Sequence, residues 1–343
     1  MKRHLNTLYV TTQGAYLSKE GATIVVRADG ETRGQFPLHN LDGVVCFGQV
    51  SASPFLLGEC AEQGVTVTFL TERGRFLARV EGPVKGNVLL RREQYRRAES
   101  PQHSAVVAGA VVAAKIANSR TMLLRAAREL PPGEPRSALR EAASELRRLL
   151  QLVVKERDLD RVRGLEGGAA RAYFGVFDRL LRQQRVDFAF GARSRRPPLD
   201  PINALLSFVY TLLVHDCRSA LESVGLDPAV GFLHRDRPGR PSLALDLMEE
   251  LRPVIAERVV ISLVNLKQVE ANGFSTGETG AVVMDDDTRK TVLVAYQKRK
   301  QEELIHPFLG EKTTIGMVPH LQALLLARHL RGDLDGYPAY FWR

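Results

Sequence analysis

The sequence predicts an α+β protein in which a small, mainly β N-terminal domain precedes a larger all-α domain. Residues 5–81 consist of short segments rich in β-branched and aromatic residues, separated by Gly, Asp and Asn. From Ser104 onward, apolar residues instead recur at the spacing of amphipathic helices. A chain of 343 residues is long enough to bury a core in each of two domains. We therefore expect a β domain over residues 1–84, a linker over 85–103 and a helical domain over 104–343.

Local signals define the elements of the β domain. Asp29-Gly30 is a hairpin-type turn signal. Ser53 is a suitable helix cap before Pro54 at the first helical position, and Gly64 is a suitable stop, so one short helix is expected over 53–64. The acidic residues of this domain occur singly at turns, which makes it a candidate for dimerisation rather than chemistry. The expected strands are residues 5–12, 15–21, 23–29, 32–39, 41–48 and 65–80.

The linker and the helical domain follow. The linker carries four arginines, at positions 91, 92, 96 and 97, which fit a solvated connecting helix and a DNA-backbone contact equally well. The motif PPGEP at 131–135 separates the first two long helical stretches. Further helical spacing covers residues 163–184, 198–225 and 291–304. The aromatic C-terminal tail, which ends with Trp342, is expected to dock either on the core or on a partner.

Composition narrows the class of protein. Lys and Arg number 48 against 39 Asp and Glu, and this excess of +9 favours a polyanionic partner such as nucleic acid. The sequence contains no run of about 18 apolar residues, so no membrane span is expected. Cys46, Cys60 and Cys217 each lie in an apolar run, as expected for buried thiols in a reducing cytoplasm. Motifs of nucleotide-driven motors and of serine hydrolases are absent from the sequence, which disfavours both classes.

The segment 225–253 combines a lone histidine with a group of acidic residues. His234 precedes a Pro-, Gly- and Arg-rich loop, after which Asp246 lies three residues before Glu249 and four before Glu250. If this segment is helical, Asp246 shares a face with both glutamates. An imidazole and carboxylates brought together by a loop suit a divalent metal. The alternative is an ordinary acidic surface helix.

A third candidate ligand, Glu166, lies on a glycine-flanked helical stretch. Gly164, Gly167 and Gly168 each cost about 1 kcal/mol in a helix relative to alanine. Their presence suggests that a backbone approaches closely, either from a neighbouring helix or from a ligand. The sequence leaves both explanations open.

Basic residues of the second domain are candidates for DNA contact. A loop with two prolines holds three arginines, and Asn203 follows it either as a contact or as a hydrogen-bonding residue at a helix start. The basic cluster of the stretch 291–304 is either a phosphate contact or a solvated face. The candidates are Arg193, Arg195, Arg196, Asn203, Lys298, Arg299, Lys300 and Lys312.

Four motifs in order resemble those of the CRISPR-associated protein one family. They are RGLEGGAARxYF (163–174), DPxNALLSFxY (200–210), GLDPxxGFLH (225–234) and DLMEELRP (246–253). The resemblance extends over essentially the whole chain, including VVCFGQVSASPFLL and FLTERGRFLARV. It implies a β-sandwich-like N-terminal domain, a helical catalytic domain and a metal-dependent endonuclease and integrase of CRISPR adaptation.

The resemblance also implies a site and partners. Glu166, His234 and Glu249 match the family's metal ligands for Mg²⁺ or Mn²⁺, and Asp246 matches a further acidic position close to the metal. New spacers would enter the CRISPR repeat through attack by the 3′-hydroxyl of a double-stranded prespacer. The implied partners are a second copy of the chain and CRISPR-associated protein two. The competing functions are a branched-DNA repair endonuclease with the same ligands and a non-catalytic DNA-binding module.

Overall fold

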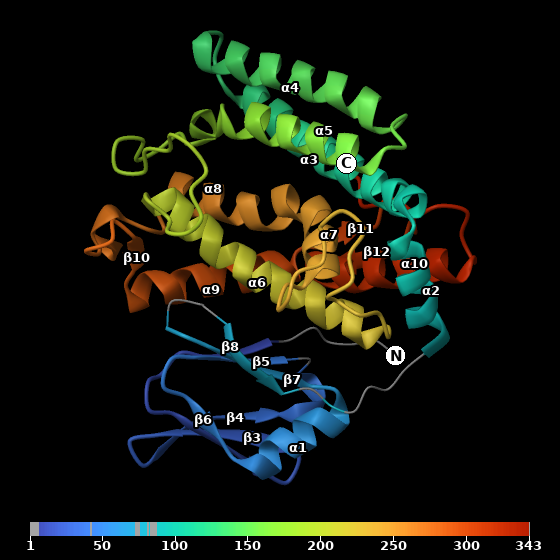
Figure 1. The fold of residues 1–343 in the computed structure, drawn as a ribbon. Coiled ribbons are helices and arrows are strands. Elements are labelled where there is room, and N and C mark those ends of the chain that lie inside the picture. The colour runs from blue at the N-terminus through green and yellow to red at the C-terminus, as the bar shows by residue number, and fades with distance from the viewer. Residues whose placement is uncertain (1–6, 42, 73–75, 81, 83–87, 343) are drawn as a thin grey trace. The chain divides into compact units, whose positions relative to one another are not determined.

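The structure, a computed structural model, divides into two compact units, Met1–Gly86 and Asn87–Arg343. It describes residues 7–41, 43–72, 76–80, 82 and 88–342. The units are drawn in blue and in cyan to red in Figure 1, and each is described by itself. The expected linker differs from the structure, because residues 88–99 and 101–103 are helical and belong to the second unit.

The first unit contains two four-stranded sheets, in the strand orders β1-β5-β7-β8 and β4-β3-β2-β6. Apolar side chains of both sheets and of helix α1 form one core, which includes Leu17, Ile24, Cys46, Leu56 and Val67. The sandwich-like β region is thereby confirmed. The strands are β1 Thr7–Val10, β2 Tyr16–Glu20, β3 Thr23–Ala28, β4 Glu31–Pro37, β5 Gly43–Phe47, β6 Ser51–Ala52, β7 Thr66–Leu70 and β8 Phe76–Val80, and the helix is α1 Pro54–Gln63.

Two local predictions in this unit are confirmed. Asp29 and Gly30 have φ angles of 54° and 78° and connect the antiparallel strands β3 and β4; both angles lie in the left-handed region that a type I′ hairpin turn requires. Helix α1 begins where the Ser53 side chain accepts a hydrogen bond from the Leu56 amide at 3.2 Å. It ends at Gly64, whose φ of 75° is left-handed.

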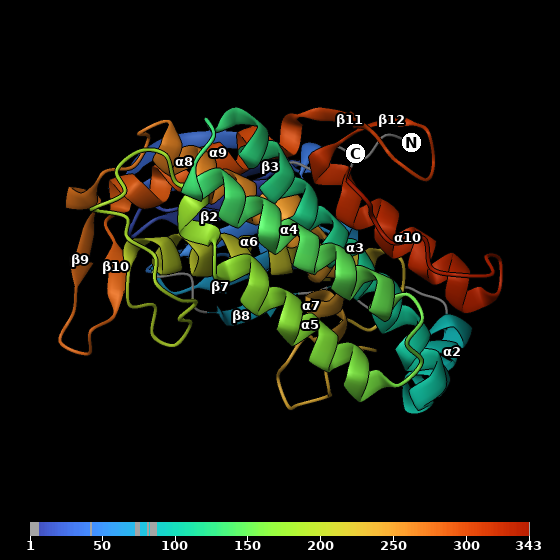
Figure 2. The ribbon, with the colours of Figure 1, turned by 90° about the horizontal axis from the view of Figure 1, so that it is seen from above.

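The second unit is built mainly from helices. Figures 1 and 2 show α3, α4 and α5 lying together, with α6 to α9 packed beneath them. The helices are α2 Val88–Glu99, α3 Pro101–Glu129, α4 Glu134–Val153, α5 Leu159–Phe174, α6 Pro201–Ser223, α7 Ser242–Leu251, α8 Arg258–Asn265, α9 Asp286–Gln301 and α10 Val318–Arg331. Two small hairpins complete it: β9 Phe274–Thr276 with β10 Val282–Met284, and β11 Glu303–Ile305 with β12 Lys312–Thr314.

Helix α3 is the central helix of this unit. It is long and apolar enough to cross a membrane, yet 72% of its most apolar window is buried inside the protein. Its many alanines let α4 and α5 approach closely, and both helices pack along it. Helix α3 is therefore a core helix of the second unit.

The helix predicted over residues 163–184 ends earlier than expected. Helix α5 stops at Phe174, and a 3₁₀ turn follows at Phe177–Leu180. The turn places the Phe177 ring 5.5 Å from that of Phe174 and 5.1 Å from that of Phe190. Packing of this aromatic cluster outweighs the helical spacing of the sequence.

The C-terminal tail docks on the helical unit itself. Tyr337 and Tyr340 are buried, and Asn118 of α3 donates a hydrogen bond to the Tyr340 carbonyl at 2.8 Å. The Asn118 side chain also accepts from the Trp342 amide at 2.7 Å, and the Arg125 guanidinium lies 3.9 Å from the Trp342 ring. Of the two expectations for the tail, docking on the core is the one that the structure supports.

Candidate active site

Asp246, in the middle of α7, organises the loop that carries His234. Its Oδ2 accepts hydrogen bonds from the amides of Phe232 and Leu233 at 2.6 and 2.9 Å, and its Oδ1 accepts from the His234 amide at 3.0 Å. A Cβ on Gly231 would lie 2.9 Å from Oδ2, so the loop can pass this close only with glycine there. Asp246 is therefore fully used in holding the loop.

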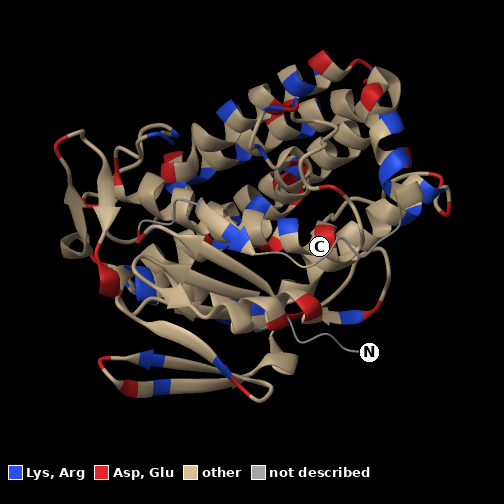
Figure 3. Cartoon of the chain, turned by 60° about the horizontal axis from the view of Figure 1, so that its bottom comes forward, with Lys and Arg blue, Asp and Glu red and all other residues tan. Residues whose placement is uncertain are grey.

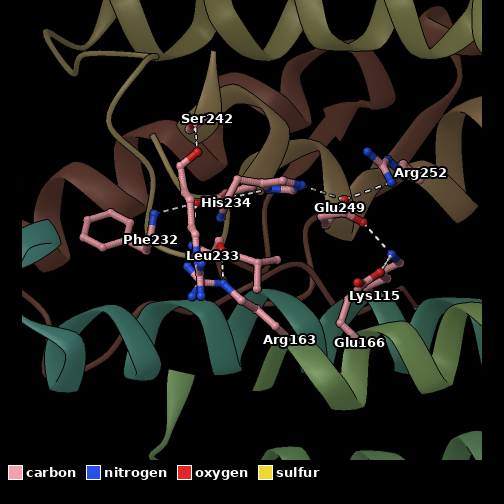
Figure 4. A network of polar contacts seen from close by, with 11 residues as sticks. Lys115, Arg163, Glu166, Phe232, Leu233, His234, Ser242, Glu249 and Arg252 are labelled. Carbon is pink, nitrogen blue, oxygen red and sulfur yellow. Dashed lines mark hydrogen bonds and ion pairs between the residues drawn. The ribbon is translucent and has the colours of Figure 1, made fainter. Parts of the chain in front are cut away.

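The same carboxylate orients the His234 ring. Nδ1 lies 2.6 Å from Oδ1 of Asp246, and because an ionised carboxylate only accepts, Nδ1 carries the proton. Nε2 faces Glu249, whose Oε1 lies 3.8 Å away. Figure 4 shows His234 and Glu249 facing each other. In metal-binding histidines, a carboxylate usually holds the ring nitrogen that does not bind the metal.

Glu249 lies on the side of α7 that faces His234. Its Oε1 pairs with Arg252 at 2.9 Å and its Oε2 with Lys115 at 2.6 Å. Burial raises the pKa of Glu249, but Arg252, Lys115 and His234 outweigh it and lower the pKa to about 2. Arg252 itself begins a π-helical turn, Arg252–Glu257, directly after α7.

The neighbouring glutamate points elsewhere. Glu250 accepts a hydrogen bond from the Tyr337 hydroxyl and one from the Tyr340 amide at 2.6 Å. Burial raises its pKa to about 7 despite these bonds. Of the two adjacent glutamates, only Glu249 is thus placed beside His234, while Glu250 anchors the tail.

Helix α5 brings Glu166 to the site. Glu166 forms an ion pair with Lys115 of α3, and three residues earlier Arg163 donates to the Leu233 carbonyl at 2.7 Å. That bond ties α5 to the histidine loop (Figure 4). No neighbouring helix approaches the glycines closely: a Cβ on Gly164 would meet nothing within 4 Å, and one on Gly168 would make ordinary contacts.

Lys115 is a residue that the sequence interpretation missed. It is the only charged residue between His103 and Arg120, in an otherwise apolar stretch, and such a lysine needs a buried partner. Its ammonium contacts both Glu166 and Glu249, and its side chain is only 10% exposed. Burial lowers the pKa of Lys115, but Glu249 and Glu166 outweigh it, so the pKa lies above its ordinary value.

Glu166, His234 and Glu249 have the chemistry that a divalent metal needs, but their side chains do not converge on one point. In the described part of the chain, no three His, Cys, Asp or Glu side chains stand close enough to hold an ion as they are. The Lys115 ammonium lies between the two carboxylates instead. Among the described residues, Lys115 is the one partner that the structure shows for the buried Glu249 Oε2. Two carboxylates with one imidazole suit Mg²⁺ or Mn²⁺.

A small cavity of about 20 Å³ adjoins this centre. It is lined by Lys115, Arg195, Tyr210, Arg252 and Glu257, among others. The Tyr210 hydroxyl donates to Glu257 Oε1 at 2.6 Å, and the Arg252 guanidinium lies 5.0 Å from the Tyr210 ring. The motif DPxNALLSFxY thus contributes Tyr210 to the surroundings of the site.

Two of the expected DNA contacts on the arginine loop are not free to contact DNA. Asn203 is fully buried: its side chain donates to the Ala192 carbonyl at 2.8 Å and accepts from Arg193 at 2.6 Å. Arg193 is partly buried, and burial lowers its pKa. These two residues therefore build the loop, which corrects the expectation that they face DNA. Arg195 and Arg196 of the same loop are exposed.

The other basic candidates also differ in exposure. Lys300 is buried, and its ammonium lies 2.9 Å from the Asp216 carboxylate, which supplies the counter-charge that a buried lysine needs. In this position Lys300 does not contact DNA. Arg299 pairs with Glu302 and donates to the Val254 carbonyl at 2.8 Å. Lys298 and Lys312 are exposed, and Lys312 pairs with Glu303 at 2.8 Å. Figure 3 shows basic residues spread along several helices of the second unit.

The helical domain brings together two carboxylates, an oriented imidazole and buried cations, which are groups that metal-assisted enzymes use. The family described as CRISPR associated protein Cas1 matches residues 8–298. The CRISPR-associated endonuclease Cas1 1 of Chlorobaculum tepidum is 56% identical over 343 residues, covering all of both chains. The CRISPR-associated endonuclease Cas1 2 of Rhodospirillum rubrum is 55% identical over 347 residues, again over all of both chains.

Solved structures agree in fold. The Cas1 protein TM1797 of Thermotoga maritima aligns with a TM-score of 0.81 at 21% identity, over 95% of this chain and 97% of its own. A casposase bound to its integration product aligns with a TM-score of 0.82 at 22% identity, over 99% and 95%. The chain belongs to the Cas1 family. The family, the fold class and a CRISPR-associated nuclease as the function are therefore confirmed.

Proposed function

We propose that this chain is a metal-dependent DNA endonuclease and integrase of CRISPR adaptation. The observation that carries the proposal is the arrangement of Glu166 and Glu249 around one cation, beside His234 Nε2, which lies 3.8 Å from Glu249 Oε1. Relatives that match over their full length are named endonucleases. Such a site, with open positions for water and phosphate, suits phosphodiester chemistry.

Glu166, His234 through Nε2 and Glu249 are the residues that would hold Mg²⁺ or Mn²⁺. When bound, the ion polarises a scissile phosphodiester and lowers the pKa of the attacking hydroxyl. Asp246 holds the imidazole through Nδ1 and turns Nε2 towards Glu249. Arg252, which pairs with Glu249, adds positive charge next to the proposed ligands. This charge would stabilise the negative charge that develops on the phosphate during the reaction.

One site can serve two reactions, since only the nucleophile differs. With water, a P–O bond of the DNA breaks and a new P–O bond to the water oxygen forms, which is cleavage. With the 3′-hydroxyl of a prespacer, the 3′-oxygen bonds to phosphorus, its proton leaves, and the repeat strand departs with a free 3′-hydroxyl. Joining a spacer to the repeat therefore needs no further energy source.

The proposed partners follow from charge and from relatives. The excess of basic residues and the exposed Arg195 and Arg196 fit double-stranded DNA. A protein of similar fold is described in a Cas6-RT-Cas1–Cas2 complex. By analogy we infer a Cas2 partner, with a homodimer formed through the β unit. The three cysteines are buried and free of disulfides, which fits the reducing cytoplasm.

The test is a strand-transfer assay with the full chain, its Cas2 partner, a labelled prespacer and a repeat-bearing plasmid, in Mn²⁺ or Mg²⁺. Transfer that requires a 3′-hydroxyl and disappears in His234→Ala supports the integrase. Cutting of branched DNA without any transfer favours the repair endonuclease. Tight DNA binding with no metal-dependent chemistry contradicts both enzyme functions.

A further inference from the structure

Lys115 lies where the proposed metal centre needs a cation. Its ammonium contacts Glu166 and the otherwise unbonded Oε2 of Glu249. Together Glu166 and Glu249 carry two negative charges, which Lys115 and the ion-paired Arg252 balance. A divalent ion bound to the same two carboxylates therefore meets a positive charge already in place, and like charges so close strongly disfavour each other.

The cavity beside the site offers this ammonium a second partner. Glu257 lines the same cavity as Lys115 and is only 3% exposed. Its Oε1 is bonded to Tyr210, but its Oε2 is buried and lacks a hydrogen bond of normal geometry. The Tyr173 hydroxyl also interacts with Glu257. A buried carboxylate has lost its hydration, so it favours the arrival of a cation.

We propose that Lys115 is a positioning residue that exchanges with the metal: its ammonium holds Glu166 and Glu249 in the metal-free protein and moves across the cavity to Glu257 when a divalent ion binds. This inference rests on the proposed metal centre. A lysine suits the exchange because its flexible stem carries a compact charge with three donors. The space required is small, because the ammonium is about the size of the water that such a cavity holds.

The exchange accounts for the position of Lys115 between two of the three proposed ligands. Two buried carboxylates with no cation between them would repel each other and distort the helices that carry them. Lys115 keeps Glu166 on α5 and Glu249 on α7 facing one point. The metal then finds its ligands already oriented, at the cost of displacing the ammonium.

The experiment measures the Kd of Mn²⁺ for the full chain without DNA, by the paramagnetic resonance signal of free Mn²⁺. We expect Lys115→Met to lower the Kd at least about tenfold, equal to about 1.4 kcal/mol, because no ammonium competes. Glu257→Gln is expected to raise the Kd about fivefold, because the displaced ammonium loses its partner. The Kd of the double variant, which combines Lys115→Met with Glu257→Gln, should equal that of Lys115→Met alone. The reason is that Glu257 acts on metal binding only through Lys115.

Lys300→Met is the matched control, because it removes another buried lysine that pairs with a carboxylate, away from the cavity residues. It should leave the Kd of Mn²⁺ unchanged. Lys115→Gln replaces Lys115→Met if the latter does not fold, as judged by circular dichroism. An unchanged or higher Kd in the Lys115 variant overturns the exchange, and so does an effect of Glu257→Gln that persists without Lys115.

Failure of the metal centre gives a different pattern. If the wild-type chain binds Mn²⁺ and His234→Ala weakens this binding, the proposed centre stands, and the Lys115 variants judge the exchange alone. If the wild-type chain does not bind Mn²⁺ at millimolar concentration, the centre and the exchange both fall.

Discussion

Asp246 Oδ1 lies 2.6 Å from His234 Nδ1 while also accepting the backbone amide of the same histidine at 3.0 Å. One carboxylate oxygen thus fixes both the ring and the backbone of His234. The second oxygen holds the two preceding amides, so a single side chain shapes the whole loop. Asp246, which matches a further acidic position of the family, thus has a physical role here: it orients His234, a proposed metal ligand.

Asp246→Asn tests this role. An asparagine places an amide donor against backbone donors or against Nδ1, so the loop and the histidine tautomer lose their support. We expect the affinity for Mn²⁺ to fall about 10–100-fold and the free energy of unfolding to fall by about 1.5–3 kcal/mol, measured by Mn²⁺ titration and urea denaturation. Asp227→Asn, which alters a carboxylate earlier in the same segment, should leave Mn²⁺ binding unchanged. Equal effects of both changes would contradict a specific role of Asp246.

Glu250 makes stability depend on pH near neutrality. Burial raises its pKa to about 7, so the folded state holds a proton that the unfolded chain loses near pH 4.5. The stability linked to that proton is complete below about pH 4.5 and is lost as the pH rises through about 7. We expect the free energy of unfolding to decline from pH 5 to pH 8 in the wild type and to decline less in Glu250→Gln, measured by urea denaturation.

Glu257 contributes in the same direction, because burial raises its pKa too. Glu257→Gln is therefore measured in parallel, and the two reductions in slope should add. An identical slope in wild type and Glu250→Gln would show that Glu250 is ionised throughout.

The tail is expected to be an integral part of the helical core. Tyr340 is buried, and its ring lies 5.7 Å from that of His306. Tyr340→Ala should lower the free energy of unfolding by about 3–5 kcal/mol, as for other buried aromatics. The neighbouring Phe341 is 41% exposed, so Phe341→Ala should change stability by about 0.5 kcal/mol or less. Similar losses in both variants would contradict the docking of the tail through Tyr340.

The exposed arginines of the loop 193–196 are expected to bind phosphate. Arg195→Ala and Arg196→Ala should each weaken binding of double-stranded DNA and reduce the slope of log Kd against log salt concentration by about 1. Fluorescence anisotropy at several salt concentrations measures both quantities. Lys300→Met, which removes an equal but buried charge, should leave the slope unchanged. A slope that responds only to Lys300→Met would exclude the loop as a phosphate contact.

Local signals explain why so much of the first unit could be predicted. The hairpin at Asp29-Gly30 and the helix from Ser53 to Gly64 depend on residues adjacent in sequence, and both form as expected. The end of α5 could not be predicted in this way, since it is set by Phe177 packing against Phe190 from a later loop.

The candidate site shows the same difference between features set by local sequence and features set by tertiary packing. The resemblance to the family's motifs pointed to His234 and Glu249, which the structure brings within 3.8 Å of each other, and to Glu166, which reaches Glu249 through Lys115. It could not show that Lys115 lies between the two glutamates, because α3, α5 and α7 meet only in the folded chain. For the same reason the burial of Lys300 against Asp216 was invisible in a basic stretch of sequence.

The most direct test of the central claim is the rate of Mn²⁺-dependent strand transfer by Glu166→Ala. Loss of even a supporting residue at a metal site costs about 10–100-fold, so loss of a ligand should lower the rate at least about 100-fold while the urea denaturation curve changes little. Glu156→Ala, which removes a glutamate outside the site, should transfer at the wild-type rate. Transfer by Glu166→Ala at the wild-type rate, or loss of its fold, would contradict the claim that Glu166 is a metal ligand.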